Sequence, residues 1–460
     1  MLPEKPIVII GGVAAGMSAA SQLKRQLPDR NVIVIERGDY ISYGACGMPF
    51  YVSGEIKDYN KLIVLKPEKA ESERGINLKL RHEALYIDPK EKIVGVKNLE
   101  NKEDFAISYD KLVIATGSSA IVPDIDGIDA NGVFVLKELI DGIKINNYIE
   151  EKKPKKSIII GGGFIGVEVA ESFVKRGMDV TILEAAPRIL TVLDEDFSKI
   201  AEDSIVKNSV NIIKNAKIKK INKNREGYVS EVVLESGEKI ETELVLVSIG
   251  VKPNSELAKN AGLELGERDA ILVDRFLRTS DENIFAAGDC ATVYHKLLDK
   301  DLYIPLALGA NRQGRMCGEN IAAIIKGEKV EEFPGIIGTS MTKTFDLEIA
   351  KTGIGENEIK KYNLKDIEST DIKYFAKAGY YPQRSKIWVK LYFNTKNKKI
   401  VGAQIIGNDG SALRIDTVVA SIYMGATVDD LYSMDLGYCP PFSPVWDPLL
   451  VVARQALKKE

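Results

Sequence analysis

The hydrophobic pattern of the chain begins with a short run that is apolar throughout. Residues 7–10 read Ile-Val-Ile-Ile, which is typical of a strand buried on both faces of a parallel sheet. The glycine-rich stretch 11–16 follows directly and leads into a helical pattern that ends near Gln26. A second apolar run, 32–35, ends on the acid Glu36. The start of the chain is therefore predicted to be strand, turn, helix and strand.

The same arrangement recurs later in the chain. Residues 157–160 are again strand-like, the turn 161–166 carries glycine at each position of the G-x-G-x-x-G pattern, and the strand 180–183 ends on Glu184. In such a unit the backbone N–H groups of the turn approach a pyrophosphate, the helix N-terminus favours its charge, and the acid accepts ribose hydroxyls. Two units predict two nucleotides bound by one chain.

The two units differ at one glycine, because Val13 is the middle residue of the first fingerprint. Taken alone, the first turn also fits an ordinary α/β turn. The expected nucleotide contacts are the turns, the acids and their neighbours: Gly11, Gly12, Ala14, Ala15, Gly16, Glu36, Arg37 and Ser42 with Ala115, Thr116, Gly117, Gly288 and Asp289 for the first nucleotide, and Gly161, Gly163, Phe164, Ile165, Gly166, Glu168 and Glu184 for the second.

Two more strands run into small residues. Residues 112–114 lead into Ala115, Thr116 and Gly117, and a later run over 283–287 leads into Gly288 and Asp289. With the two glycine turns, these segments indicate that the first nucleotide is FAD. Asp289 would then hydrogen-bond ribityl or phosphate oxygens.

These motifs, which span essentially the whole chain, resemble those of the pyridine nucleotide–disulfide oxidoreductase superfamily. Cys46 lies in a Ser-aromatic-x-x-Cys stretch that starts at Ser42, and the C-terminal stretch 438–444 reads Tyr-Cys-Pro-Pro-Phe-Ser-Pro. Both are similar to the branch of coenzyme A-disulfide reductases and NAD(P)H sulfur or polysulfide reductases. The resemblance implies FAD in the first unit, NADH or NADPH in the second, a catalytic Cys46, and Tyr438 and Tyr380 as proton donors.

The domain organisation follows from these motifs and the resemblance. We expect an α/β fold with two Rossmann-like nucleotide-binding domains and a C-terminal α+β dimerisation domain. Its C-terminal pattern includes strands at 387–393 and 400–406 and a helix over 411–424. The expected boundaries are listed by domain: 1–123 and 251–327 for a discontinuous FAD-binding domain, 124–250 for the NAD(P)H-binding domain, and 328–460 for dimerisation.

The missing residues narrow the chemistry. Disulfide reductases with a cysteine pair need a second cysteine where this chain has Tyr51, and a C-terminal histidine as base, whereas the two histidines here are His82 and His295, both expected at the surface. A peroxidase of the superfamily would carry a histidine near Ala14. The pattern favours a mixed disulfide between Cys46 and a small thiol, with the pKa of Cys46 lowered by its surroundings.

Two departures from the branch change the expected substrate. Tyr43 replaces a phenylalanine, and Ala45 replaces an asparagine often found before the cysteine of coenzyme A-disulfide reductases. Coenzyme A is therefore a possible partner, and sulfur or polysulfide the stronger substrate class. Cys439 fits either a small packing residue or a second redox thiol.

Composition excludes several other classes of function. With 63 Lys and Arg against 66 Asp and Glu, the formal net charge of -3 gives no basic field for nucleic acid. No apolar run approaches the ~20 residues that span a bilayer. The four cysteines lie far apart and form no CxxC pair, which favours reduced thiols in the cytoplasm and no metal site.

Together these observations predict an FAD enzyme, and the resemblance implies a homodimer with active sites shared between subunits. It would use NADH, or NADPH, to reduce CoA disulfide, CoA persulfide, polysulfide or elemental sulfur through one cysteine. Two alternatives stay open at this point: an NADH oxidase that reduces O2 at the flavin, and a flavin-bearing redox sensor in which Cys46 is a switch.

Overall fold

The first apolar run forms β1 (Ile7–Ile10), the central strand of a five-stranded parallel sheet. The computed structural model describes residues 4–382 and 384–458. We call this the N-terminal sheet; its order is β18-β7-β1-β2-β3, with β2 (Val32–Glu36), β3 (Asn77–Leu80), β7 (Lys111–Ile114) and β18 (Ile284–Ala286). Since β18 comes from far along the chain, this sheet is built from two separate segments, which agrees with the expected discontinuous domain.

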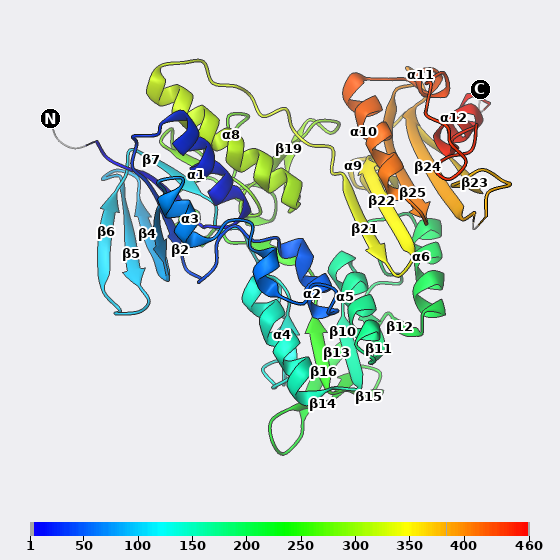
Figure 1. The fold of residues 1–460 in the computed structure, drawn as a ribbon, viewed down its shortest axis with the longest axis horizontal. Helices are drawn as coiled ribbons and strands as arrows, with labels where there is room; N and C mark the ends of the chain where they lie inside the picture. Colours follow the sequence, from blue (N-terminus) through cyan, green and yellow to red (C-terminus); the bar gives the residue numbers. More distant parts are fainter. Residues whose placement is uncertain (1–3, 383, 459–460) are drawn as a thin grey trace.

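Two helices that are distant in sequence pack together beside this sheet. The helix α1 (Ala14–Gln26) follows the first glycine turn, and α8 (Ala307–Lys326) lies against it (Figure 1). Three short antiparallel strands extend the same part of the molecule, namely β4 (His82–Asp88), β5 (Ile93–Asn98) and β6 (Asp104–Ser108).

The second glycine turn builds a sheet of the same design. This middle sheet has the order β12-β11-β10-β16-β9 and is parallel throughout: β9 (Val133–Val135), β10 (Lys156–Ile160), β11 (Asp179–Glu184), β12 (Val210–Lys214) and β16 (Leu244–Val247). Its helices are α4 (Leu139–Lys152), α5 (Phe164–Lys175) and α6 (Glu195–Lys207). The three-stranded sheet β13 (Ile218–Lys223), β14 (Val229–Leu234) and β15 (Lys239–Glu241) lies beside it.

The chain enters and leaves the middle part through two paired strands. β8 (Ser118–Ala120) pairs antiparallel with β17 (Val251–Pro253). This pairing joins the outgoing and returning segments, while the exact boundaries at 123, 250 and 327 stay predictions. The remaining short elements are α2 (Met48–Val52), α3 (Pro67–Ser72), α7 (Glu256–Asn260), β19 (Val293–His295) and β20 (Lys300–Leu302).

The C-terminal sheet is antiparallel, with the order β21-β22-β25-β24-β23. Its strands are β21 (Ser340–Thr344), β22 (Leu347–Gly353), β23 (Ile367–Phe375), β24 (Lys386–Asn394) and β25 (Ile400–Gly407). Its helices are α9 (Glu356–Tyr362), α10 (Ile415–Met424), α11 (Val428–Tyr432) and α12 (Pro448–Leu457). The expected helix over 411–424 begins as a 3-10 turn, Ala412–Arg414, before α10. The predicted fold class is confirmed.

The hydrophobic cores connect these parts. Met48 and Val52 of α2 belong to the core of the middle sheet, and so do Leu347 and Ile406 of the C-terminal sheet. The segment that follows Cys46 therefore bridges the N-terminal and middle sheets. No helix in the described part of the chain is long and apolar enough to cross a bilayer.

Both glycine turns press closely on the helix that follows them. A Cβ at Gly16 would lie 1.8 Å from the carbonyl oxygen of Gly11, and one at Gly166 would lie 2.0 Å from that of Gly161. We expect Gly16→Ala to destabilise the fold by at least the about 1–3 kcal/mol of an overpacked core, because the obstructing atom is backbone. The measurement is the midpoint of thermal unfolding.

The matched control is Gly309→Ala in α8, where an added Cβ meets nothing within 4 Å. That change should leave the midpoint unchanged or raise it, because alanine is about 0.5–1 kcal/mol better than glycine inside a helix. Equal midpoints for the two variants would show that the turn yields easily and is not tightly packed.

Candidate active site

One continuous cavity of about 1450 Å³ runs between the two glycine turns and past Cys46. This volume exceeds the about 300–1,000 Å³ of ordinary small-molecule pockets, so the cavity has room for more than one ligand. Most of the predicted contacts line it: Gly11, Ala14, Ala15, Glu36, Arg37, Ala115, Thr116, Gly117, Gly288 and Asp289 from the first set, and Gly161, Gly163, Phe164, Ile165, Glu168 and Glu184 from the second.

Four predicted residues lie behind the cavity wall. Gly16 and Gly166 carry the close contacts between helix and turn described above. The backbone N–H of Gly12 donates to Oε2 of Glu36 at 2.7 Å, and its carbonyl accepts from the backbone N–H of Ser42 at 2.9 Å. These residues shape the site rather than line it.

The acids at the two strand ends are held in the same way. Glu36 accepts from the backbone N–H groups of Gly12 and Gly38, each at 2.7 Å. Glu184 accepts from the N–H groups of Gly162 at 2.7 Å and Ala186 at 2.8 Å. Burial raises the pKa of Glu36 from its ordinary value, and the two N–H groups oppose that rise. Each carboxylate oxygen keeps a lone pair that a ribose hydroxyl can use.

The cavity fits the predicted nucleotides at its backbone. Gly11 and Gly161 both have φ near +105°, a conformation that L side chains rarely adopt, and each turns the chain against a neighbouring carbonyl. A Cβ at Gly163 would meet nothing within 4 Å, so the backbone at the start of α5 stands open to the cavity. This is the approach that a pyrophosphate needs.

Asp289 joins the two parts of the cavity in a way that the sequence did not signal. Its Oδ2 accepts from Nζ of Lys137 at 2.9 Å and from Oγ of Ser118 at 3.0 Å. Lys137 lies between β9 and α4, in the middle part of the chain, and no local motif marks it. Arg37, by contrast, forms an exposed ion pair with Glu138 at 3.1 Å.

Cys46 lies in a 3-10 turn, Ala45–Gly47, directly before α2, and its side chain is accessible from the cavity. Burial of the thiol and the charge of Glu168 raise its pKa, whereas Lys137 lowers it. The expected lowering of the pKa is therefore wrong for the protein's own groups. The main reason is burial of the thiol, and the carboxylates of Glu168 and Asp289 add to the rise against the single lysine.

The C-terminal sheet also forms part of the cavity wall. Oγ1 of Thr342, on β21, donates to Oε1 of Glu168 at 2.5 Å, and burial raises the pKa of this glutamate. Residues 339–341 line the cavity beside it. The carboxylate of Glu168, a residue of α5, is thus held by the C-terminal sheet, close to Cys46.

Tyr380 and Tyr438 lie together on the surface of the C-terminal domain. Their hydroxyl oxygens are 2.5 Å apart, and the N–H of Ala378 ties the two loops by donating to the carbonyl of Pro440 at 3.2 Å. The hydrogen bond to Tyr380 raises the pKa of Tyr438, as does the neighbouring Cys439. Neither tyrosine lines the cavity of its own chain.

The surface next to this tyrosine pair is unusually apolar. Tyr380 is 74% exposed and Tyr438 46%, and Phe442, Val445 and Trp446, which follow Tyr438 in the chain, are 75%, 63% and 52% exposed. Large apolar side chains gathered on one surface are typical of a face that another chain covers.

The remaining cysteines and the two histidines differ in their burial. Cys290 and Cys317 are buried and free, as expected for packing residues, whereas Cys439 is exposed. His82 is half-buried. His295 is only 3% exposed, so its expected surface position is wrong. It pairs with Lys300 between β19 and β20, and its Nδ1 accepts from the backbone N–H of Leu298 at 3.3 Å.

Curated relatives match along nearly the whole chain. The NAD(P)H sulfur oxidoreductase (CoA-dependent) of Pyrococcus furiosus is 40% identical over 98% of this chain and 99% of the relative. An NADH oxidase of Methanocaldococcus jannaschii is 34% identical over 98% of each chain. The coenzyme A disulfide reductase of Staphylococcus aureus is 30% identical over 98% of this chain and 99% of the relative.

The solved structures agree with the sequence relatives. The NAD-dependent persulfide reductase of A. fulgidus superimposes with a TM-score of 0.93 at 36% identity, over 99% of this chain and 83% of that one. The family model for pyridine nucleotide-disulphide oxidoreductases matches residues 5–314, and the model for the dimerisation domain of the same family matches residues 339–448. The chain therefore belongs to the pyridine nucleotide-disulphide oxidoreductase family.

Proposed function

We propose that the protein is an FAD-dependent NAD(P)H oxidoreductase that reduces CoA disulfide, CoA persulfide or polysulfide through Cys46. The observation that carries the proposal is one thiol in a cavity that both nucleotide turns line. Position 51, where a cysteine pair would need its second thiol, is a buried tyrosine. The names of the relatives from P. furiosus and S. aureus support the substrate class.

The residues of the cavity divide the binding between two nucleotides. The N-terminal sheet, Glu36 and Asp289 would hold FAD, and α5 with Glu184 would hold the nicotinamide nucleotide. Bound FAD would supply the two-electron carrier between NADH and the thiol. Lys137 and Glu168 place one positive and one negative charge near Cys46.

The reaction at Cys46 would take two steps, one thiol–disulfide exchange and one two-electron reduction. The Cys46 thiolate attacks a substrate disulfide, a mixed disulfide forms, and one substrate thiolate leaves. Two electrons, supplied ultimately by NADH, then cleave the mixed disulfide and release the second thiolate, which restores the Cys46 thiolate. Each departing thiolate takes a proton, for which Tyr438 of the partner subunit is the proposed donor.

We also propose a homodimer with shared sites, which the position of the tyrosine pair supports. Tyr380 and Tyr438 lie outside the cavity of their own chain, on a surface with exposed Phe442 and Trp446. The match to a dimerisation domain supports covering of this surface by a second copy. We also propose a cytoplasmic location, which the four free cysteines support.

NADH is the expected donor. A 2′-phosphate would meet the Glu184 carboxylate, and Arg188 is held elsewhere because its Nη2 donates to the carbonyl of Leu193 at 3.3 Å. Like charges in contact cost several kcal/mol, so kcat/KM should favour NADH by at least about tenfold. The measurement is kcat/KM for each donor.

Glu184→Ala should reduce the preference in kcat/KM for NADH over NADPH. Asp179→Ala, at the exposed start of the same strand, should leave that preference unchanged. Equal specificity constants in the unsubstituted enzyme would mean that Arg188 turns inward to the phosphate.

NADH oxidation by O2 is the second candidate function, which the M. jannaschii relative favours. The two candidates separate on the product of NADH oxidation. Thiol or sulfide released in proportion to NADH supports the sulfur reductase, and oxygen uptake at the same rate with no thiol product supports the oxidase. The third possibility, a redox sensor, predicts no multiple turnover with either acceptor.

A further inference from the structure

The loop between β11 and α6 forms one edge of the cavity. Ala185 and Thr191 line the cavity next to Glu184. The loop is tied to the second glycine turn, because the N–H of Leu190 donates to the carbonyl of Gly162 at 2.8 Å. The position of residues 185–194, which we call the ribose loop, therefore sets the distance between the Glu184 edge and the turn.

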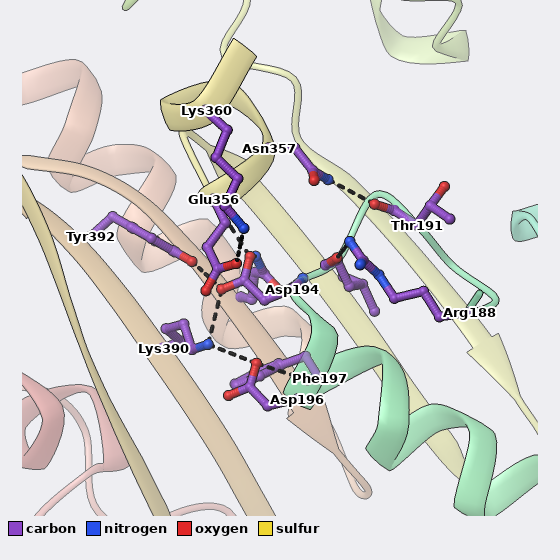
Figure 2. A network of polar contacts seen from close by, with 12 residues as sticks. Arg188, Thr191, Asp194, Asp196, Phe197, Glu356, Asn357, Lys360, Lys390 and Tyr392 are labelled. Atoms are coloured by element: carbon purple, nitrogen blue, oxygen red, sulfur yellow. Dashed lines mark hydrogen bonds and ion pairs between the residues drawn. The ribbon is translucent and has the colours of Figure 1, made fainter. Parts of the chain in front are cut away.

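The C-terminal domain holds this loop from the other side (Figure 2). Nδ2 of Asn357, on α9, donates to the carbonyl of Thr191 at 2.7 Å. Three residues further on, the backbone N–H of Asp194 donates to Oε1 of Gln404, on β25, at 3.0 Å. Both contacts are made to the backbone of the loop, so they fix its path whatever its side chains do.

The carboxylate of Asp194 is the centre of the attachment. It is 1% exposed, and Oδ2 accepts from Nζ of Lys390 at 2.9 Å and from the hydroxyl of Tyr392. Oδ1 accepts from Nε2 of Gln404 at 2.6 Å. Each of these donors lies on β24 or β25 of the C-terminal sheet, whereas Asp194 directly precedes α6.

The cluster is charged in the folded protein. Burial opposes ionisation of Asp194, but the hydrogen bonds from Tyr392 and Lys390 hold its pKa below the ordinary value. Burial likewise works against the charge of Lys390, but Asp196 and Asp194 raise its pKa overall. A buried ion pair adds little net stability compared with an apolar replacement. We therefore expect the pair of Asp194 and Lys390 to act mainly by fixing the position of the loop on the C-terminal sheet.

We propose that the C-terminal domain positions the ribose loop for the nicotinamide nucleotide, with Asp194 and Asn357 as positioning residues. The same domain would thus tune nucleotide affinity from within one chain, besides joining two chains. The inference rests on the proposed function only in assigning the second glycine turn to NAD(P)H. Neither residue touches Cys46 or the tyrosine pair, so the sulfur half of the reaction should not depend on them.

The decisive variant is Asn357→Ala, which removes the bond to Thr191 and leaves no buried charge. In the FAD-loaded dimer we expect the Kd for NAD+, by calorimetry, and the KM for NADH to rise by about three- to tenfold, the loss of one hydrogen bond. The KM for the sulfur acceptor and the unfolding midpoint without nucleotide should not change. Lys360→Ala, on the same helix, is the matched control, because its ammonium pairs with the half-exposed Glu356 and not with the loop backbone.

Asp194→Asn should raise the Kd for NAD+ and the KM for NADH further. Asp203→Asn on α6, where Asp203 is an exposed partner of Lys199, should change neither constant. Should Asp194→Asn fail to fold, Asn357→Ala alone decides the question. Unchanged Kd for NAD+ in Asn357→Ala would overturn the inference, as would equal rises in the constants for nucleotide and sulfur acceptor. No NAD+ binding by the unsubstituted protein would refute the proposed function and the inference together.

Discussion

Replacing Cys46 with serine is expected to abolish reduction of disulfides and polysulfide, with a loss on the order of 10³-fold or more. The serine hydroxyl is not ionised at neutral pH and cannot form the mixed disulfide. Transfer of electrons from NADH to an artificial dye needs only the nucleotide sites, so it should persist. The measurement is the two activities side by side on protein with the same FAD content.

Cys439→Ser is the matched control, since Cys439 is the other exposed cysteine of the chain. If Cys439 is a packing residue, that variant retains both activities; if it loses only disulfide reduction, a second redox thiol takes part. Survival of disulfide reduction in Cys46→Ser, or loss of both activities with FAD retained, would refute the role given to Cys46.

Tyr438→Phe is expected to slow disulfide reduction by roughly 10²-fold, which is the usual size of a lost general acid when no water replaces it. The hydroxyl of Tyr438 shares a hydrogen bond with that of Tyr380, 2.5 Å away. Reduction of bound FAD by NADH should be unaffected, because the tyrosine pair lies outside the cavity of its own chain. Rapid mixing separates the two half-reactions.

The shared site makes a sharper version of this test possible. Mixed dimers of Cys46→Ser and Tyr438→Phe subunits should regain activity, because one of their two sites then has both Cys46 and Tyr438. The comparison is with each parent dimer at equal FAD content. Mixed dimers that form but stay as inactive as their parents would contradict the shared site and would indicate that Tyr438 is a packing residue.

The parts of the fold that follow from local pattern were predictable from the sequence. β1 and β10 are short apolar runs directly before glycine turns, and Glu36 and Glu184 sit at the strand ends where the pattern places them. The return of β18 to the N-terminal sheet was also predictable, but only through the resemblance to a family. Local pattern and resemblance together gave the architecture.

The contacts between distant segments were not predictable in the same way. Lys137 with Asp289, Thr342 with Glu168, and Asp194 with Lys390 join residues far apart in the chain, and no periodicity records such pairs. The predicted direction of the Cys46 pKa shift was wrong for the same reason, since both the burial of the thiol and its neighbour Glu168 depend on distant parts of the chain. Which of the predicted residues contact the nucleotides stays a prediction.

The most direct test of the account is to locate the sulfur adduct. The FAD-loaded dimer is treated with CoA disulfide or with polysulfide, its free thiols are blocked, and its peptides are mapped by mass spectrometry before and after NADH is added. The account predicts a CoA or sulfur adduct on Cys46 that NADH removes. An unmodified Cys46 while the enzyme turns over, or an adduct confined to Cys439, would contradict it.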